Sequence, residues 1–171
     1  TVALDNVSFE VPAGEFVAIL GVSGSGKSTL LRCLSALAEP TSGDIVIDGE
    51  PMLPPRPEVA MIFQQHNIIS DMTAYSNALT GGIHEAGLLE SIFQLQERGE
   101  KERALEALET VGLLNEAEQK ARSMSGGQQQ RVGIARALVQ RPEVLLADEP
   151  VASLDPGSAQ AVMRYLQRAS E

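Results

Sequence analysis

Residues 21–28 combine three glycines, three serines and a lysine in a spacing suited to holding phosphate. The segment reads Gly-Val-Ser-Gly-Ser-Gly-Lys-Ser and matches the pattern G-x-x-x-x-G-K-[ST] at every fixed position. Glycines let the backbone curl so that successive N–H groups point at phosphate oxygens. Lys27 would then reach the β- and γ-phosphates of a nucleotide, and the Ser28 hydroxyl would ligate Mg²⁺. The nucleotide-binding residues predicted here are Gly21, Ser23, Gly24, Ser25, Gly26, Lys27, Ser28 and Thr29.

Two carboxylates follow an apolar run near the other end of the chain. Residues 144–147 read as a buried strand, and Asp148 and Glu149 come directly after it. Such a strand end is costly to bury unless something charged lies beside it. Asp148 fits a role at Mg²⁺, and Glu149 fits the residue that polarises an attacking water. The alternative is a helix cap or a solvated turn, but Pro150 and the upstream phosphate-binding pattern favour catalysis.

A third polar segment, Ser125-Gly126-Gly127-Gln128, lies between these two. A serine followed three residues later by glutamine is a capping box, which predicts that a helix begins here. A capped helix N-terminus attracts anions, and two adjacent glycines let phosphate come close to the backbone. We therefore expect these four residues to bind nucleotide as well as to start a helix.

These segments need strands and helices to position them. The apolar run 16–20, directly before the glycine-rich loop, is expected to be a strand buried in a parallel sheet. A helix is expected over 28–37, and further strands over the ranges 2–11, 45–47, 59–63 and 144–147. Between residues 73 and 119 the pattern is helical, with no convincing strand. A last helix should open with Asp155 at its N-cap and Pro156 at its first position.

This succession of elements predicts an α/β fold with a parallel sheet and an inserted α-helical subdomain. We expect a single domain over residues 1–171. Residues 1–70 and 140–171 would form the nucleotide-binding core, and residues 71–139 the helical subdomain that carries Ser125.

The composition limits the possible partners and compartments. The chain has 23 acidic and 13 basic residues and a formal net charge of −10, which disfavours non-specific binding to nucleic acid. Its single cysteine, Cys33, cannot form an intramolecular disulfide, which fits a reducing compartment. No apolar run reaches the ~20 residues that span a bilayer. A role at a membrane would therefore be played from its cytoplasmic face, through a partner.

Taken in order, these motifs resemble those of the ABC ATPases. Residues 124–128, Met-Ser-Gly-Gly-Gln, are similar to the family's signature motif, which usually begins with leucine, a residue of similar volume. The resemblance covers essentially the whole chain and implies a P-loop NTPase (RecA-like) core of the ABC ATPase type that binds ATP and Mg²⁺. In this family the signature motif completes the site of a second subunit, so that two chains enclose two nucleotides head to tail. The implied partner is a second ATP-binding subunit, expected to be identical.

The resemblance also assigns roles that spacing alone does not. Gln64, directly after Phe63, matches the family's Q-loop glutamine, which senses Mg²⁺ and the attacking water; Gln65 is the less favoured alternative. Residues 152–155 resemble the D-loop, which crosses the dimer interface, and make Asp155 a nucleotide-binding candidate. The catalytic residues implied are Glu149, Gln64 and Lys27, and the metal ligands are Ser28, Gln64 and Asp148.

A finer resemblance points to the ATP-binding subunits of phosphonate importers. It rests on residues 30–34, 128–131, 137–140 and 147–156 and partly on 79–93, where Gly-Ile-His departs from a more basic version. It implies a motor coupled to transmembrane permease subunits, served indirectly by a periplasmic or extracellular substrate-binding protein. The motor would lie at the cytoplasmic face of the cell membrane and drive uptake of phosphonate or a related phosphorus oxyanion.

Two other functions stay open. An ABC exporter or lipoprotein-release ATPase shares every motif and differs only in its partner subunits. A soluble ABC ATPase of DNA repair, chromosome organisation or translation is the other alternative. Repair and chromosome types separate their halves by long coiled coils, whereas only about a hundred residues without heptads separate the two motifs here.

Two family features are not found in the sequence. They are an aromatic residue that stacks on adenine, upstream of the first strand, and a switch histidine beyond the D-loop helix. His66 and His84 are expected to be surface or docking-face residues instead. On this basis the chain is expected to be truncated at both ends, to bind ATP weakly and to turn it over poorly.

Overall fold

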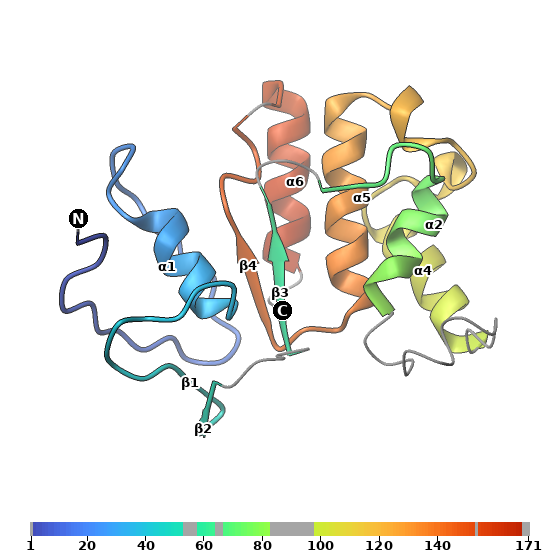
Figure 1. Ribbon diagram of the computed structural model, residues 1–171. Coiled ribbons are helices and arrows are strands. Elements are labelled where there is room, and N and C mark those ends of the chain that lie inside the picture. Colours follow the sequence, from blue (N-terminus) through green and yellow to red (C-terminus); the bar gives the residue numbers. More distant parts are fainter. Residues whose placement is uncertain (1, 53–57, 64–66, 83–97, 153, 169–171) are drawn as a thin grey trace.

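The computed structural model describes residues 2–52, 58–63, 67–82, 98–152 and 154–168. Figure 1 shows the strand pair β3–β4 between α1 on one side and α5 and α6 on the other. The helices are α1 (Lys27–Leu34), α2 (Ala74–Leu79), α4 (Arg98–Thr110), α5 (Gly126–Val139) and α6 (Pro156–Arg168). The strands are β1 (Val46–Ile47), β2 (Glu50–Pro51), β3 (Val59–Ile62) and β4 (Val144–Ala147). Three 3₁₀ turns are η1 (Thr80–Gly82), η2 (Leu114–Glu116) and η3 (Ala121–Ser123).

The strands β3 and β4 pair in parallel, with Val59 opposite Val144 and Ile62 opposite Ala147. Because successive side chains of a strand point to opposite faces, the pair supplies apolar residues to two separate clusters. Ala60 and Ile62 pack with the helical core, whereas Val59 and Leu146 pack with Leu31 of α1. Strands covered on both faces in this way explain the continuous apolar runs in the sequence.

The larger cluster is helical and is centred on α5, which contacts both α2 and α4. Leu108, Ile134 and Val162, from three different helices, are fully buried in it. Alanines on facing turns allow the helices to come close, and those with no exposed surface are Ala74, Ala78, Ala104, Ala121 and Ala135. Within the described part of residues 73–119 there is no strand, only an isolated bridge from Thr73 to Lys120. The helical character predicted for this stretch is therefore confirmed for the residues described.

The short strands β1 and β2 form an antiparallel hairpin closed by Asp48 and Gly49. Both turn residues have positive φ, 51° and 80° respectively. This is the signature of a type I′ turn, which matches the twist of the flanking strands. The strand predicted over 45–47 is found over Val46–Ile47, and Pro51 is the last residue of β2.

Two predicted strands are absent from the described structure. Residues 2–11 and 16–20 form no strand, and apart from Leu4 their apolar side chains are exposed, with Phe16 at 48% and Leu20 at 91%. A parallel strand needs a neighbour to bond its N–H and C=O groups. The ladders among the described residues join β1 to β2 and β3 to β4, and neither reaches the 16–20 segment. An apolar run indicates a segment that favours burial, but it does not identify the neighbouring strand or helix that would bury it.

The helix predicted over 28–37 is also shorter than expected. It spans Lys27–Leu34, since Ser35 caps it and Ala36 takes a left-handed φ of 57°. No helix in the described parts of the chain has the length and apolarity to cross a bilayer. The division into a core and a helical subdomain at residues 70 and 140 stays a prediction.

Candidate nucleotide site

The glycine-rich loop ends at Gly26, which precedes α1 with a φ of 92°. A Cβ atom there would lie 2.5 Å from the carbonyl oxygen of Ala3 and 3.1 Å from a methyl carbon of Leu4. Real Cβ atoms do not approach backbone oxygen so closely, and the positive φ already disfavours other residues. Glycine is therefore required at this position both by the backbone conformation and by the chain that passes over it.

Lys27, at the first position of α1, folds back over the loop. Its ammonium group donates hydrogen bonds to the carbonyl oxygens of Gly21, at 2.8 Å, and Val22, at 3.0 Å. The charge is thus held against the backbone of the loop, whose N–H groups are of the kind that bind anions. Phosphate binding would exchange these two bonds for stronger charge-assisted bonds to phosphate oxygens.

The loop and the end of β4 meet at Ser28 and Asp148. Ser28 Oγ donates a hydrogen bond of 3.0 Å to Asp148 Oδ1. The position of Asp148 is fixed by the sheet, because its backbone N–H donates to the carbonyl oxygen of Ile62 at 2.9 Å. A hydroxyl and a carboxylate from segments far apart in the sequence are therefore neighbours at one edge of the strand pair.

The donors at this edge suit Mg²⁺. Among the described residues no group of three or more His, Cys, Asp or Glu side chains could hold a metal ion. Magnesium usually takes only one or two protein carboxylates and keeps water and phosphate oxygens as its other ligands. The adjacent Ser28 hydroxyl and Asp148 carboxylate fit such a site. Gln64, also predicted as a ligand, lies outside the described residues.

Glu149 follows Asp148 with a φ of 48°, in the left-handed region that residues other than glycine rarely adopt. The strand ends there, and the carbonyl oxygen of Glu149 accepts a hydrogen bond from Ala152 in the turn that follows. A strained backbone of this kind persists only where the surroundings fix it, and it is common at functional sites. The exposed carboxylate of Glu149 is thus placed one residue beyond the Ser28–Asp148 pair.

The capping box predicted at Ser125 is confirmed. Its hydroxyl accepts a hydrogen bond from the backbone N–H of Gln128, and the side-chain oxygen of Gln128 accepts one from the N–H of Ser125. The two glycines between them differ. A Cβ on Gly126 would meet nothing within 4 Å, whereas a Cβ on Gly127 would lie 2.8 Å from Ser158 Oγ of α6. Only Gly126 is open to an approaching anion, and Gly127 serves the packing of α5 on α6.

Asp155 caps α6, as predicted. Its Oδ1 accepts hydrogen bonds from the backbone N–H groups of Gly157, at 3.0 Å, and Ser158, at 3.1 Å. These bonds, chiefly those with Ser158, hold the pKa of Asp155 below its usual value. Ser153, in the same predicted D-loop, lies outside the described residues.

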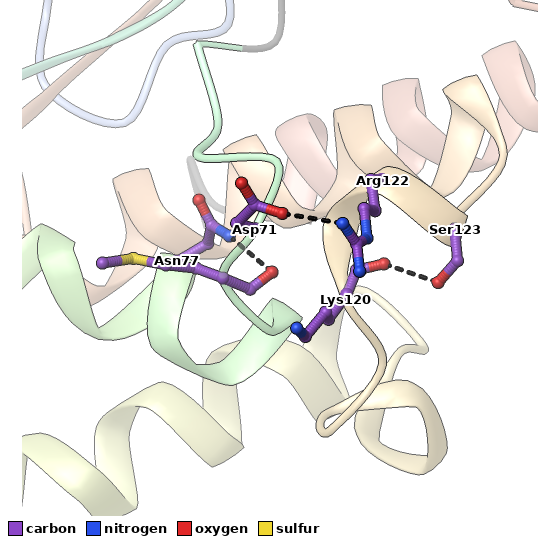
Figure 2. Close-up of polar contacts among 6 residues, drawn as sticks. Asp71, Asn77, Lys120, Arg122 and Ser123 are labelled. Atoms are coloured by element: carbon purple, nitrogen blue, oxygen red, sulfur yellow. Dashed lines mark hydrogen bonds and ion pairs between the residues drawn. The ribbon is translucent and has the colours of Figure 1, made fainter.

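A further group of polar residues next to the signature motif was not predicted from the sequence. Figure 2 shows Asp71 and Asn77 beside Lys120, Arg122 and Ser123, which directly precede Met124. Two signals in the sequence could have indicated part of it. Thr73 caps α2 by accepting a hydrogen bond from the backbone N–H of Ser76, and Asn77 shares the buried face of α2 with Ala74 and Ala78.

The model of the ABC transporter family matches residues 4–152. The phosphonates import ATP-binding protein PhnC of Halobacterium salinarum is 64% identical over 169 residues, which make up 99% of this chain and 60% of that protein. PhnC 2 of Haloquadratum walsbyi is 59% identical over 169 residues, with the same two coverages. The chain thus spans about 60% of the length of these relatives.

Solved ABC cassettes share the fold. A dimeric cassette in a post-hydrolysis state, bound to ADP and Pi, superposes with a TM-score of 0.80 at 38% identity, covering 99% of this chain and 75% of that one. A cassette in its ADP conformation gives a TM-score of 0.84 at 30% identity, covering 98% of this chain and 70% of that one.

Proposed function

This chain belongs to the ABC transporter family, and on that premise we propose that it is the ATP-binding and ATP-hydrolysing core of the motor subunit of an importer. The observation that carries the proposal is the 3.0 Å hydrogen bond between Ser28 and Asp148. It unites the glycine-rich loop, suited to phosphate, with the strand end that carries the candidate catalytic carboxylate. The core is a P-loop NTPase of the ABC type, as in the solved cassettes.

The proposed reaction is in-line attack of water on the γ-phosphate of ATP, with ADP as the leaving group. Such a reaction depends on positioning and charge neutralisation more than on covalent chemistry. Lys27 leaves the loop carbonyls to neutralise the β- and γ-phosphates, and Glu149 accepts a hydrogen bond from the attacking water. Gln64 is proposed to help position the same water.

Mg²⁺ is proposed to bind at Ser28 and Asp148, with Gln64 as a further ligand. When bound, it would neutralise charge on the phosphate oxygens. Asp148 suits this role because the sheet fixes its backbone and Ser28 orients its carboxylate. A carboxylate held in this way needs little reorganisation on binding, which favours both affinity and rate.

A second copy of the chain is the proposed partner at the nucleotide. The glycine-rich loop leads into α1 on one face of β3–β4, whereas the signature motif begins α5, which packs on the other face (Figure 1). Two phosphate-binding helix ends on opposite faces suit a head-to-tail dimer, in which the Ser125 end of one copy completes the site of the other. The solved cassette with ADP and Pi is itself dimeric.

The cargo is proposed from the relatives. Those described above are named as phosphonates import proteins. We therefore assign the motor to uptake of phosphonate or a related phosphorus oxyanion, driven through permease subunits and a substrate-binding protein. The proposed location is peripheral, at the cytoplasmic face of the cell membrane.

The experiment that tests this function is ATP hydrolysis by the full-length subunit, reconstituted with its membrane subunits in vesicles. Binding protein would be added empty or loaded with phosphonate, phosphite, phosphate or an amino acid. We expect stimulation by a phosphorus oxyanion alone, and none in the variant Glu149→Gln, which should still bind ATP.

The other outcomes separate the alternatives. Hydrolysis that no loaded binding protein stimulates would favour an exporter or a soluble motor. Stimulation by the amino acid would keep the importer and reject the cargo. Full activity of Glu149→Gln would remove the proposed role of that carboxylate.

A further inference from the structure

Two segments far apart in the sequence lie side by side next to the signature motif. The segment 70–75 bonds to the segment 117–122 through four backbone hydrogen bonds, each of 2.9 Å. Their donors and acceptors are Ala74 to Gln119, Tyr75 to Ala117, Ala121 to Met72, and Arg122 to Ser70. The first segment follows Gln64 by a few residues, and the second leads directly into Met124 and Ser125. We call this ladder the clasp.

Asn77 fixes the shape of the first segment of the clasp. Its side chain has no exposed surface, and its Oδ1 accepts a hydrogen bond of 2.7 Å from the backbone N–H of Ile69. Its Nδ2 donates to the carbonyl oxygens of Ile69 and Thr73, both at 3.0 Å. One buried amide therefore satisfies backbone groups at both ends of the turn that presents Ser70 and Met72 to the clasp.

The exposed ion pair in the clasp contributes less to its stability than the hydrogen bonds of Asn77 do. Figure 2 shows Asp71 and Arg122 bridging the two segments at 3.0 Å. Their side chains are 80% and 61% exposed respectively, and exposed ion pairs contribute little to stability. The clasp therefore depends on its backbone ladder and on Asn77.

Two side chains of the helix α5 donate hydrogen bonds to the backbone near the two segments of the clasp. Gln129 Nε2 donates to the carbonyl oxygens of Ala121, at 2.9 Å, and Met124, at 3.3 Å, and so ties the second segment to the start of α5. Two turns further on, Arg136 Nη1 donates to the carbonyl oxygen of Asn67, the first described residue after the Q-loop segment. The same helix thus holds the chain where it leaves the Q-loop and where it enters the signature motif.

We propose that Asn77 and Arg136 are positioning residues for Ser125. Through their hydrogen bonds, the segment that follows Gln64 and the capped start of α5 are held in a fixed position relative to each other. The inference rests on the proposed function, in which Ser125 serves the nucleotide held by the partner subunit. A hydrogen-bonded path alone does not establish coupling, so the variants must be tested for an effect on the partner's site. Loosening the clasp should weaken closure of the dimer on ATP and leave the chain's own nucleotide site intact.

The test uses the full-length subunit carrying Glu149→Gln, so that ATP is bound and not consumed. Three quantities are measured in Asn77→Ala, namely exchange of the Ala121 and Arg122 amides, affinity of the monomer for a fluorescent ATP analogue, and ATP-driven dimerisation by sedimentation. Both amides should exchange faster, and monomer affinity should stay within about twofold of the parent. Dimerisation should weaken by about 5- to 150-fold, the usual range of coupling between two sites. Asn115→Ala, at an exposed residue in η2, is the matched control.

Arg136→Met gives a second route if Asn77→Ala fails to fold. It removes the donor to Asn67 and should also weaken dimerisation, whereas Arg136→Lys retains a donor and should keep most of it. Dimerisation as tight as in the Asn115→Ala control would overturn the proposal, as would an equal loss of ATP affinity in the monomer. A Glu149→Gln parent that neither binds ATP nor dimerises would instead contradict the proposed function.

Discussion

Ser28 and Asp148 are joined by a hydrogen bond of 3.0 Å although 120 positions separate them in the sequence. The bond orients the carboxylate toward the end of the glycine-rich loop. Its two partners come from α1 and from the end of β4, so a change in either side chain tests the junction of these elements.

The variant Asp148→Asn should separate the charge of this residue from its structural role. Asparagine keeps an oxygen that can accept from Ser28, so the free energy of unfolding should change by less than about 1 kcal/mol. The missing charge should weaken Mg²⁺-dependent binding of ATP, because carboxylates are preferred magnesium ligands. Titration of a fluorescent ATP analogue with and without EDTA measures the effect. A variant that keeps the full Mg²⁺ dependence would exclude Asp148 as a ligand.

Replacing Gly26 by alanine should destabilise the protein more than the same change at Gly24. Both residues have positive φ, 92° and 79°, so alanine is strained at either position by about 1 kcal/mol. Only at Gly26 does the new Cβ also meet the carbonyl oxygen of Ala3, at 2.5 Å. The two variants are compared by urea denaturation. Equal losses in the free energy of unfolding would mean that the segment at Ala3 moves away from the new Cβ without a loss of stability.

The adjacent glycines of the signature motif should respond differently to alanine. Gly127→Ala places a Cβ 2.8 Å from Ser158 Oγ, so α5 or α6 must shift and stability should fall by about 1–3 kcal/mol. Gly126→Ala meets nothing within 4 Å and should leave stability unchanged or slightly raised. It should nevertheless impair ATP-driven dimerisation, since its side is open to the partner's nucleotide. Thermal unfolding and sedimentation measure the two effects, and impaired stability in Gly126→Ala would contradict this assignment.

The Asp155 cap predicts an acid-dependent loss of stability. Its hydrogen bonds with Ser158 lower the pKa in the folded chain, so the folded state binds the proton less readily than the unfolded state. The stabilisation is therefore fully present above the unfolded pKa of about 3.9 and is lost as the pH falls through the lower folded pKa. Asp155→Asn also caps helices but does not titrate. Urea midpoints between pH 2.5 and 5, an interval around that pKa of about 3.9, should depend less on pH in Asp155→Asn than in the parent. Identical profiles would assign the acid sensitivity to other carboxylates.

The sequence predicted the elements that have a local signature. The caps at Ser125 and Asp155 depend on residues close together in the chain, and both are found. The strands predicted from apolar runs at 59–63 and 144–147 are found at 59–62 and 144–147, and they pair with each other. The run 16–20 is equally apolar but has no strand partner among the described residues, because strand formation depends on what lies beside the segment.

The clasp was not predicted because its bonds are made mostly by backbone groups. Any residue other than proline can supply such bonds, so the composition of 70–75 and 117–122 does not indicate that they pair. The roles of Lys27, Glu149 and Asp148 were predicted from motif and resemblance, and they stay predictions. The structure adds to them that Ser28 and Asp148 touch and that the backbone of Glu149 is strained.

The parallel pairing of Val59 with Val144 has a consequence for the order in which the chain folds. During synthesis β3 leaves the ribosome long before β4, which is its parallel partner among the described strands. The helices α2, α4 and α5 are made in between and contact one another, so they can pack first and shorten the loop that strand pairing must close. Slowing translation between β3 and β4 would therefore lengthen the time for which Ala60 and Ile62 are exposed to solvent and can cause aggregation. Mutations in α2, α4 and α5 should also slow folding more than mutations in α6.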